Sequence, residues 1–248
     1  MKFERLELLV GNENLNLIQD KTVMIVGLGG VGGYATESIV RCGIKKIVIV
    51  DFDTIDESNI NRQIIATIDS VDKYKVDAWE ERIKKINPDC EVIKVKEYID
   101  EDNIDHLFDY NLDYIVDACD SLKTKMDLIR KSIKYNVKLI SSMGTGNKLD
   151  PSKLKIMDIR KTSYDPLAKH IRKMVKDEKI NSKVMVVCSD EKGIKKVQGT
   201  IPSNSFVPAT AGLLCTSYII NDIIKTGGNN EKNKTTSISL CMSSGYLR

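Results

Sequence analysis

Short apolar runs alternate with longer amphipathic segments over the first 145 positions of the chain. The runs at 23–26 and 47–50 consist mainly of β-branched residues, which is typical of buried strands. The segments between such runs carry apolar residues at helical spacing and end near Gly or Pro. This alternation predicts βαβ units in a mostly parallel sheet. We expect strands at 23–26, 47–50, 91–96, 114–118 and 138–142, and helices at 6–19 (with a break near Gly11-Asn12), 32–43, 72–86, 103–108 and 123–135.

The pattern changes after Gly144-Thr-Gly146. Strands are expected at 154–159 and 184–187, on either side of a basic helix at 165–176 that begins at a proline. An apolar helix is expected at 207–224, ending before Gly227-Gly228, and a last strand at 236–242. The predicted fold class is therefore α/β, with a Rossmann-like, doubly wound, largely parallel sheet that antiparallel strands extend in the C-terminal half.

No repeat and no low-complexity linker divides the chain, so we expect one domain over residues 1–248. It would comprise a nucleotide-binding half over 20–145, a basic crossover segment over 150–200, and a C-terminal helix and strand over 201–248. The composition, 42% hydrophobic and 29% charged, is that of an ordinary soluble protein.

The sequence also predicts the cellular compartment. The first residues carry no apolar run after their positive charge, so they do not resemble a secretory signal. The most apolar stretch, at 206–224, contains Pro208, Asn221 and Asp222 and is interpreted as a buried helix. We therefore expect a cytoplasmic protein without an integral membrane segment.

Charge is distributed unevenly along the chain. Residues 1–150 carry 21 Lys and Arg against 27 Asp and Glu, whereas residues 151–200 carry 13 against 6. A basic segment beside an acidic nucleotide-binding half suits a polyanionic substrate such as RNA. The alternative is a Lys-rich solvated surface. His170 lies in this basic segment and is assigned either to an RNA contact or to a solvated helix face, while His106 is interpreted as structural.

None of the six cysteines belongs to a C-x-x-C pair, and the two closest are 26 residues apart. This spacing offers no zinc knuckle. Without a secretion signal, we expect free thiols in a reducing compartment. Cys119 is interpreted as a buried strand residue, and Cys188 as either a small core residue or a thiol that handles sulfur. The other cysteines are Cys42, Cys90, Cys215 and Cys241.

A glycine-rich turn follows the first predicted strand. The spacing of Gly27, Gly29 and Gly32 fits a fingerprint in which glycines allow a tight turn, close approach of a phosphate, and packing of helix on strand. The helix that follows offers its N-terminal amides to an anion. Asp51 lies 19 residues beyond Gly32, at the end of the second strand, which suits hydrogen bonds to ribose. These residues predict a nucleotide site.

Cations near this turn indicate which nucleotide is bound. Arg62 follows the second strand with Asn59 and Gln63, and Lys75 opens the next predicted helix. NAD needs no such cations, whereas attack at the α-phosphate of ATP builds negative charge there and on the leaving pyrophosphate. Asp120, beyond the strand at 114–118, is expected to hold Mg²⁺ that bridges the phosphates. The expected cofactors are ATP and Mg²⁺; the alternative for Arg62 and Lys75 is a pair of solvated charges.

Six motifs, in order over residues 20–145, resemble those of the E1-like adenylating superfamily of the ThiF, MoeB and HesA type. The segments at 161–168 and 205–212 resemble the tRNA threonylcarbamoyladenosine dehydratase branch, so the resemblance covers nearly the whole chain. The six motifs are Gly27-Leu-Gly-Gly-Val-Gly32, Asp51-Phe-Asp53, Asn59-Ile-Asn-Arg-Gln63, Asp72-Lys-Tyr-Lys-Val76, Ile86-Asn-Pro88 and Asp117-Ala-Cys-Asp120.

The resemblance implies the E1-like activating-enzyme fold and roles for particular residues. Arg62 and Lys75 would hold the phosphates, and Asp120 would place the metal or act beside it. The homodimers of the family send an N-terminal Arg into the partner's site, and Arg5 matches that position. The implied catalytic residues are Arg62, Lys75, Asp120 and Arg5. The implied nucleotide-binding residues are Gly27, Gly29, Gly30, Gly32, Asp51, Asp53, Ser58, Asn59, Arg62, Gln63, Lys75 and Asp120.

The resemblance also implies a reaction, the ATP-dependent dehydration of N6-threonylcarbamoyladenosine next to the anticodon of tRNA. Adenylation of the threonyl carboxylate would be followed by closure of a five-membered ring and loss of AMP. The main alternative is adenylation of the C-terminus of a small ubiquitin-like sulfur-carrier protein, whose activators commonly carry two C-x-x-C zinc pairs. Weaker alternatives are a dehydrogenase or silent NAD sensor and a non-catalytic RNA-binding scaffold. A sulfur-relay protein remains a candidate partner.

Overall fold

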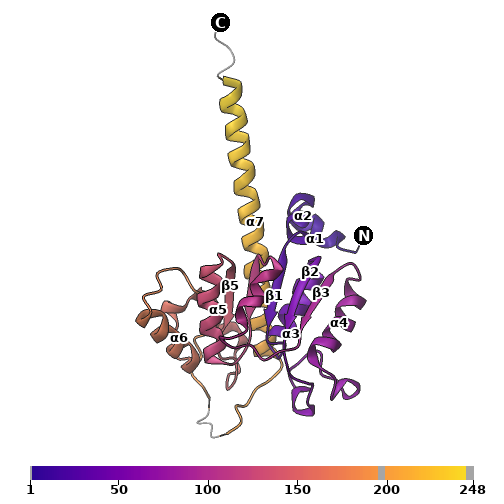
Figure 1. The fold of residues 1–248 in the computed structure, drawn as a ribbon, viewed down its shortest axis with the longest axis vertical. Helices are drawn as coiled ribbons and strands as arrows, with labels where there is room; N and C mark the ends of the chain where they lie inside the picture. The colour runs from indigo at the N-terminus through magenta and orange to yellow at the C-terminus, as the bar shows by residue number, and fades with distance from the viewer. Residues whose placement is uncertain (1, 195–198, 244–248) are drawn as a thin grey trace.

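A seven-stranded sheet in the order β3-β2-β1-β4-β5-β7-β6 forms the centre of the molecule (Figure 1). The computed structural model describes residues 2–194 and 199–243, with side chains as far as residue 227. All neighbouring strands are parallel except β6, which pairs antiparallel with β7. The predicted doubly wound sheet with an antiparallel extension is confirmed. The strands are β1 (Thr22–Val26), β2 (Lys46–Val50), β3 (Glu91–Val95), β4 (Tyr114–Asp117), β5 (Lys138–Ser142), β6 (Leu154–Asp158) and β7 (Met185–Ser189).

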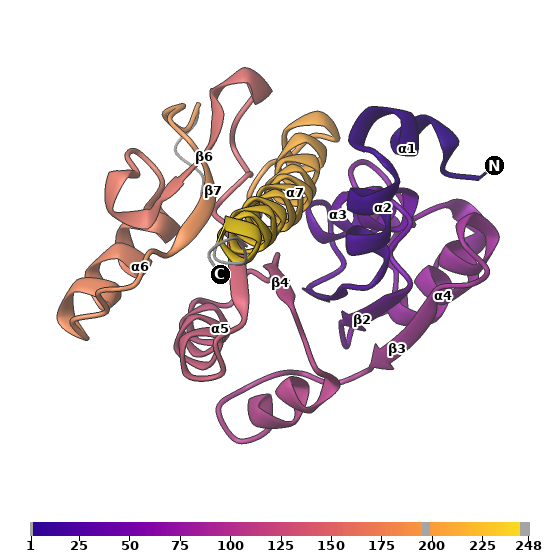
Figure 2. The ribbon, with the colours of Figure 1, turned by 90° about the horizontal axis from the view of Figure 1, so that it is seen from above.

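Helices cover both faces of the sheet (Figure 2). Helices α3, α4 and α7 pack on one face, and α5 and α6 pack on the other. Helices α1 and α2 precede the first strand, and α2 packs against α7. The α-helices are α1 (Glu4–Val10), α2 (Asn12–Gln19), α3 (Gly32–Arg41), α4 (Lys75–Ile86), α5 (Leu122–Lys134), α6 (Pro166–Asp177) and α7 (Phe206–Ser243).

Alternate residues of the central strand β1 enter different cores. Val23 and Ile25 pack under α3, α4 and α7, whereas Met24 and Val26 pack on the opposite face. Because both faces are covered, the strand reads as a continuous apolar run. The chain continues from β1 to β2 and β3 on one side and returns to β4 on the other. The crevice at the carboxyl ends of β1 and β4 is therefore the switch point where open α/β sheets bind ligands.

Helix α7 packs very closely against α3. A Cβ atom at Gly212 would lie 2.3 Å from the carbonyl oxygen of Val31, so no larger residue fits there. Among the described residues, Phe206–Gly227 is long and apolar enough to span a membrane, with a mean hydropathy of 1.3, but half of this window is buried inside the protein. This burial agrees with the predicted core helix.

The predicted end of that helix before Gly227 is wrong, as is the predicted strand at 236–242. Helix α7 continues without interruption to Ser243. A strand needs the backbone groups of a neighbouring strand to pair with. Helix α7 instead leaves the sheet and extends away from the body of the molecule (Figure 1). Within the described part of the chain, no strand lies beside residues 236–242, so their alternating pattern does not produce a strand.

Two other predicted helices differ in detail. Helix α4 begins at Lys75 rather than at 72, because Asp72 has a φ of 68° and Tyr74 is extended. The segment predicted as a helix at 103–108 is a 3₁₀ helix, η3 (Ile104–Tyr110). The late start of α4 places Lys75 in the first helical turn, at the edge of the switch-point crevice.

Candidate active site

A cavity of about 540 Å³ opens at the carboxyl ends of β1, β2 and β4. Its walls come from the glycine turn after β1, the carboxylates after β2, the loop that follows, the first turn of α4 and the segment after β4. Ten of the predicted nucleotide-binding residues line it, although they are scattered along the sequence. They are Gly27, Gly29, Gly30, Asp51, Asp53, Asn59, Arg62, Gln63, Lys75 and Asp120.

The glycine turn depends on close backbone contacts. Gly27 has a φ of 85°, and a Cβ atom there would lie 2.9 Å from the backbone of Ala118. A Cβ atom at Gly32 would lie 1.7 Å from the carbonyl oxygen of Gly27. Gly32 does not line the cavity, and its predicted role in helix packing explains why glycine is required. The turn aims the N-terminus of α3 at the cavity, where its amide groups favour an anion.

Asp51 and Lys75 are buried together beside the glycine turn. Asp51 accepts hydrogen bonds from the backbone N–H groups of Leu28 at 2.7 Å and Asp53 at 2.9 Å. Lys75 Nζ lies 2.7 Å from Asp53 Oδ2 and 3.6 Å from Asp51 Oδ1. One ammonium group therefore faces two carboxylates. Asp51 also ties the glycine turn to the end of β2, a structural role that its sequence position did not predict.

Arg62 presents part of its guanidinium group to the cavity. Its Nη1 donates hydrogen bonds to the carbonyl oxygen of Ser58 at 2.8 Å and to Asn61 Oδ1 at 2.9 Å. No described residue accepts a hydrogen bond from Nε or Nη2, so this edge is available for a phosphate. Ser58 itself does not line the cavity, and its contribution is to orient Arg62. Gln63 is buried in the wall, and its Oε1 has no partner among the described residues.

The sequence analysis missed the aromatic end of the cavity. Phe52 and Tyr98 pack edge to face there, with ring centroids 5.2 Å apart, and each ring is about half exposed. Ile99 and Thr124 line the wall beside them. These aromatic and apolar side chains suit a nucleotide base, because the flat base can stack on them. Both aromatic residues follow carboxyl ends of strands, which is the signal that would have pointed to them.

Asp120 lies exposed at the cavity wall, in the turn after β4. No described residue pairs with its carboxylate. Mg²⁺ is commonly bound by one or two carboxylates, with phosphate oxygens and waters completing its shell. A single free carboxylate that lines the same cavity as the glycine turn fits that mode of binding. The described part of the chain contains no group of three or more His, Cys, Asp or Glu that would hold a metal by itself.

Beneath this turn lies a buried ion pair that the sequence analysis also missed. Lys125 and Asp117 are both fully buried, with Lys125 Nζ 3.0 Å from Asp117 Oδ1. Lys125 also donates to the carbonyl oxygen of Ser142 at 2.8 Å, and Ser141 Oγ donates to Asp117 Oδ2 at 2.5 Å. Burial disfavours the ammonium, but the Asp117 carboxylate outweighs it and raises the pKa of Lys125. The pair joins β4, α5 and β5 under the residues that lead to Asp120.

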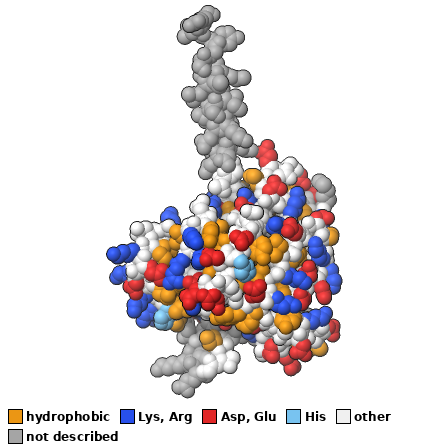
Figure 3. Space-filling view, in the orientation of Figure 1, with side chains coloured by type: hydrophobic (Ala, Val, Ile, Leu, Met, Phe, Trp, Pro, Cys, Tyr) orange, Lys and Arg blue, Asp and Glu red, His pale blue; other side chains and the backbone are white. Residues whose placement is uncertain are grey.

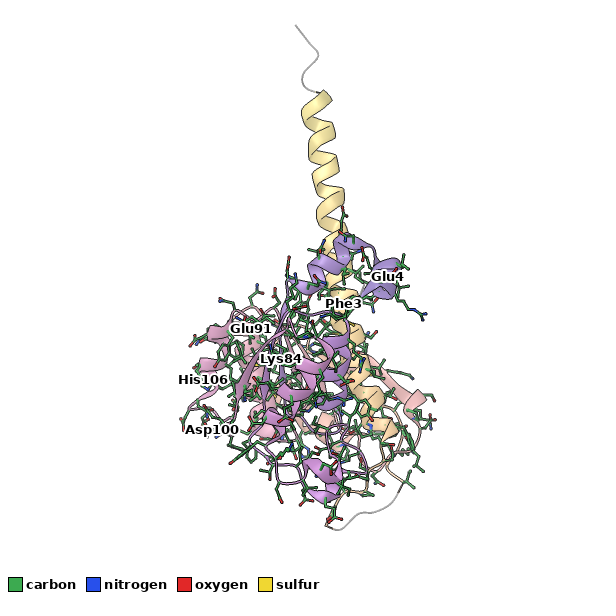
Figure 4. All side chains as sticks on the ribbon, turned by 90° about the vertical axis from the view of Figure 1, so that its right-hand side faces the viewer. Phe3, Glu4, Lys84, Glu91, Asp100 and His106 are labelled. Carbon is green, nitrogen blue, oxygen red and sulfur yellow. The ribbon has the colours of Figure 1, made fainter. Side chains whose placement is uncertain are left out.

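Arg5 does not lie at the cavity of its own chain. It is exposed on α1, beside Phe3 and Glu4. Glu91 begins β3, and Figure 4 shows Phe3 and Glu4 toward that end of the sheet. Asp100, which follows the carboxyl end of β3, lies toward the other end. The cavity opens at the carboxyl ends of the strands, so Arg5 is at the opposite end of the sheet.

The described cysteines are free, and none is suited to be a nucleophile. Burial raises the pKa of Cys188 to about 11 and that of Cys215 to about 12. Burial, and then the nearby Asp117 carboxylate, also raises the pKa of Cys119. A thiol with a raised pKa stays protonated at neutral pH and reacts slowly. Cys119 follows β4 rather than lying in it. His106 does not line the cavity, although its Nε2 lies 3.2 Å from Glu97, which does.

The fold and the cavity define a nucleotide-binding α/β protein of the doubly wound type, with cations and a free carboxylate gathered at its glycine turn. The model of the ThiF family matches residues 3–241, and the chain belongs to that family.

Its relatives are consistent with this assignment. The chain is 39% identical to the tRNA threonylcarbamoyladenosine dehydratase of Bacillus subtilis, in a match that covers 90% of this chain and 95% of the relative. It also resembles the crystal structure of the Escherichia coli tRNA N6-threonylcarbamoyladenosine dehydratase in complex with AMP, with a TM-score of 0.87 and 31% identity. The complex of the same enzyme with ATP gives a TM-score of 0.86 at the same identity. Each match covers 92% of this chain and 96% of the other.

Proposed function

We propose that this chain is an ATP-dependent dehydratase that cyclises N6-threonylcarbamoyladenosine in tRNA, next to the anticodon. The observation that carries the proposal is one cavity in which a glycine turn, Arg62, Lys75 and Asp120 converge. This set of groups suits a triphosphate held for reaction. The relatives that share the fold over nearly the whole chain include an enzyme of this name in complexes with ATP and with AMP.

The first step transfers AMP to the threonyl carboxylate. A carboxylate oxygen attacks the α-phosphorus of ATP, the bond from that phosphorus to the bridging oxygen breaks, and pyrophosphate leaves. Negative charge grows on the α-phosphoryl oxygens and on the leaving group. Arg62 offers its unoccupied Nε and Nη2 donors, and the N-terminal amides of α3 offer a second set. Lys75, which is held between Asp51 and Asp53, supplies a further positive charge at the cavity wall.

We propose that Asp120 holds Mg²⁺ in the loaded enzyme. The ion would supply positive charge that neutralises the phosphate oxygens. Asp120 is suited to this because it lines the same cavity as the glycine turn and has no partner among the described residues. The buried pair of Lys125 and Asp117 supports the turn from below.

The second step closes the ring. The ureido group of the modification attacks the activated carbonyl carbon, a five-membered ring forms, and AMP leaves. Because the nucleophile and the carbonyl belong to the same side chain, high effective molarity replaces an enzymic nucleophile. The net change is loss of one water from the nucleoside. This route needs no cysteine, which agrees with the buried and protonated thiols.

Adenylation of a sulfur-carrier protein is less well supported. The chain has no C-x-x-C pair, and its six cysteines are widely separated in sequence. The relatives with the highest similarity act on tRNA by name. A sulfur-relay protein as an additional partner would need a reactive thiol, and the described cysteines are poor candidates. An NAD-dependent reaction would leave Arg62, Lys75 and Asp120 without a role.

We further propose that the chain acts as a homodimer in the cytoplasm, with Arg5 reaching the cavity of the partner. Support comes from Arg5 itself, which is exposed at the end of the sheet remote from its own cavity. Mixing an Arg5→Ala chain with an Arg62→Ala chain tests this. If Arg5 acts across the dimer, the mixed dimer regains one complete site and part of the activity. No recovery in verified mixed dimers would contradict the assignment.

The function is tested on isolated tRNA. Substrate tRNA is incubated with the protein and ATP, digested to nucleosides and analysed by mass spectrometry, with reactions lacking ATP or containing NAD as controls. We expect loss of one water from the threonylcarbamoyl nucleoside only with ATP. An unchanged nucleoside with active, folded protein would overturn the proposal.

A further inference from the structure

Helix α6 carries a row of lysines that have no carboxylate partners. Lys169, Lys173 and Lys176 are spaced by four and three residues, so they lie on one side of the helix, and all three are exposed. None of them forms an ion pair with a described residue. Lysines elsewhere behave differently, because many pair with Asp or Glu within 3.0 Å. Examples are Lys94, Lys96, Lys123, Lys131 and Lys138.

A groove of about 1000 Å³ accompanies this row. Its described lining contains six Lys and Arg and one His but no Asp or Glu. Of the three carboxylates near the helix ends, Asp165 pairs with Lys148 and Glu178 with Arg130. Asp177 has no partner among the described residues, but it does not line the groove. The groove therefore concentrates positive charge that the protein itself does not neutralise.

Both arginines in the described lining have structural roles. Arg172 donates hydrogen bonds to the carbonyl oxygen and the hydroxyl of Thr162, and Arg160 bridges Asp158 and the carbonyl oxygen of Ile180. Both guanidinium groups are therefore partly engaged within the protein. The positively charged side chains on α6 that have no partner among the described residues are therefore the lysines.

The lysine row starts at the edge that holds the nucleotide cavity. The N-cap residue of α6, Asp165, accepts a hydrogen bond from the backbone N–H of Gly144 and pairs with buried Lys148. Gly144 precedes Thr145, which lines the cavity. At its other end, α6 is tied to α5 through Glu178 and Arg130. The row thus runs from the cavity edge along the flank of the molecule, where Figure 3 shows Lys and Arg gathered at the left-hand margin, near the position of α6 in Figure 1.

Tyr164 stands at the start of this row. Its φ of 60° is in the left-handed region, which residues with a bulky side chain rarely adopt. Its side chain is 60% exposed, so burial does not compensate for the strain. Lys192 Nζ lies 5.1 Å from the centre of the ring. Backbone strain of this kind is often found where a side chain is held for a ligand.

We propose that Tyr164, Lys169, Lys173 and Lys176, here called the α6 surface, dock a folded RNA. The lysines bind the phosphates of its stem, and Tyr164 stacks on an unpaired base of its loop. The identity of this partner rests on the proposed function, which places a loop nucleotide of tRNA in the cavity. A lysine row that leads from the cavity-side end of α6 into a basic groove matches the stem that continues from such a loop. The concave shape and the exposed ring favour RNA over a flat anionic membrane.

The lysines are tested by the salt dependence of binding. A Lys169→Gln, Lys173→Gln, Lys176→Gln variant is compared with a variant of equal charge loss at exposed lysines elsewhere in the chain, Lys45→Gln, Lys85→Gln, Lys225→Gln. Each lost phosphate contact makes the slope of log K against log salt less steep by about 0.7–0.9. Loss of three contacts therefore flattens the slope by about 2–3, and the rise in Kd between about 50 and 200 mM NaCl shrinks roughly 30-fold. The control variant keeps the wild-type slope.

Tyr164 is tested with a conservative pair of substitutions. Tyr164→Phe keeps the ring and is expected to bind tRNA like the wild type, whereas Tyr164→Ala loses the stacking and binds roughly 5- to 150-fold more weakly. Position 164 requires the same left-handed backbone in both variants. A difference in their affinity for tRNA therefore reports on the ring. Equal affinity in both variants would remove Tyr164 from the surface.

The outcomes separate this inference from the proposed function. If the wild type dehydrates tRNA and the α6 variant keeps the wild-type slope and KM for tRNA, the α6 surface is wrong and the function stands. If the α6 variant shows the flattened slope, the surface is supported even when nucleoside analysis detects no dehydration. Flattening of the slope to the same extent in the control variant would show only a general effect of net charge and would overturn the proposal.

Discussion

Removal of the buried ammonium of Lys125 should destabilise the protein far more than loss of an exposed one. Lys125 and Asp117 are both fully buried and 3.0 Å apart. In Lys125→Met, the Asp117 carboxylate keeps its bond from Ser141 but loses its counter-charge, and the Ser142 carbonyl oxygen loses a donor. Removing one partner of a buried pair typically costs about 3–5 kcal/mol. For a chain of this size, that corresponds to a fall in Tm of about 6–20 °C.

The same helix offers a matched control. Lys123 pairs with Glu101 at 3.0 Å, but both side chains are more than half exposed. Water and salt screen such a pair, so Lys123→Met should leave Tm within about 2 °C of the wild type. The double variant Lys125→Met, Asp117→Asn removes the stranded charge and should recover part of the lost stability. Calorimetry at neutral pH measures all four proteins. Equal Tm values for Lys125→Met and Lys123→Met would refute the reasoning.

Three further predictions concern the site and the core. Arg62→Ala and Asp120→Ala should each abolish dehydration without lowering Tm, because both side chains lie at the cavity wall; full turnover in either would contradict their roles. Gly32→Ala should prevent stable folding, since its Cβ would lie 1.7 Å from the Gly27 oxygen, whereas Gly29→Ala meets only Gln63 Nε2 at 3.7 Å and should keep the wild-type Tm. Cys188, with a pKa raised to about 11 by burial, should resist alkylation at about pH 8 and react faster as the pH approaches 11; rapid labelling in folded protein, measured by peptide mass spectrometry, would argue against its burial.

The sequence was sufficient to predict the nucleotide-binding half of the fold. Buried parallel strands need continuous apolar runs, and β1 and β2 follow directly from such runs at 23–26 and 47–50. The spacing of the glycines predicted the turn between β1 and α3, because few other residues allow that backbone path. The carboxyl ends of parallel strands meet at one edge, so the residues that follow them could be placed together without coordinates.

Side-chain pairing could not be predicted in the same way. Lys125 lies in an amphipathic helix where a lysine normally faces water, and only the packing of α5 on β4 and β5 buries it against Asp117. The hydrogen bond that the Leu28 amide donates to Asp51 likewise depends on how closely two loops approach each other. Such contacts depend on distances between elements, which a periodic pattern does not contain.

The C-terminal segment illustrates a limit of periodicity. Residues 236–242 alternate as a half-buried strand would, yet they belong to α7. An alternating pattern indicates only which side chains would share a face. A strand also requires the backbone of a neighbouring strand to form hydrogen bonds with. The distant end of α7 has no such neighbour in the sheet (Figure 1).

The central claim is that a substrate carboxylate attacks the α-phosphorus of ATP in the cavity. Labelling that carboxylate with ¹⁸O in the tRNA substrate and analysing the products by mass spectrometry tests it directly. If the carboxylate is adenylated, one labelled oxygen is carried into AMP at each turnover, and pyrophosphate is unlabelled. Label found in inorganic phosphate together with ADP would instead mean attack at the γ-phosphorus, and the account given for Arg62, Lys75 and the glycine turn would be wrong.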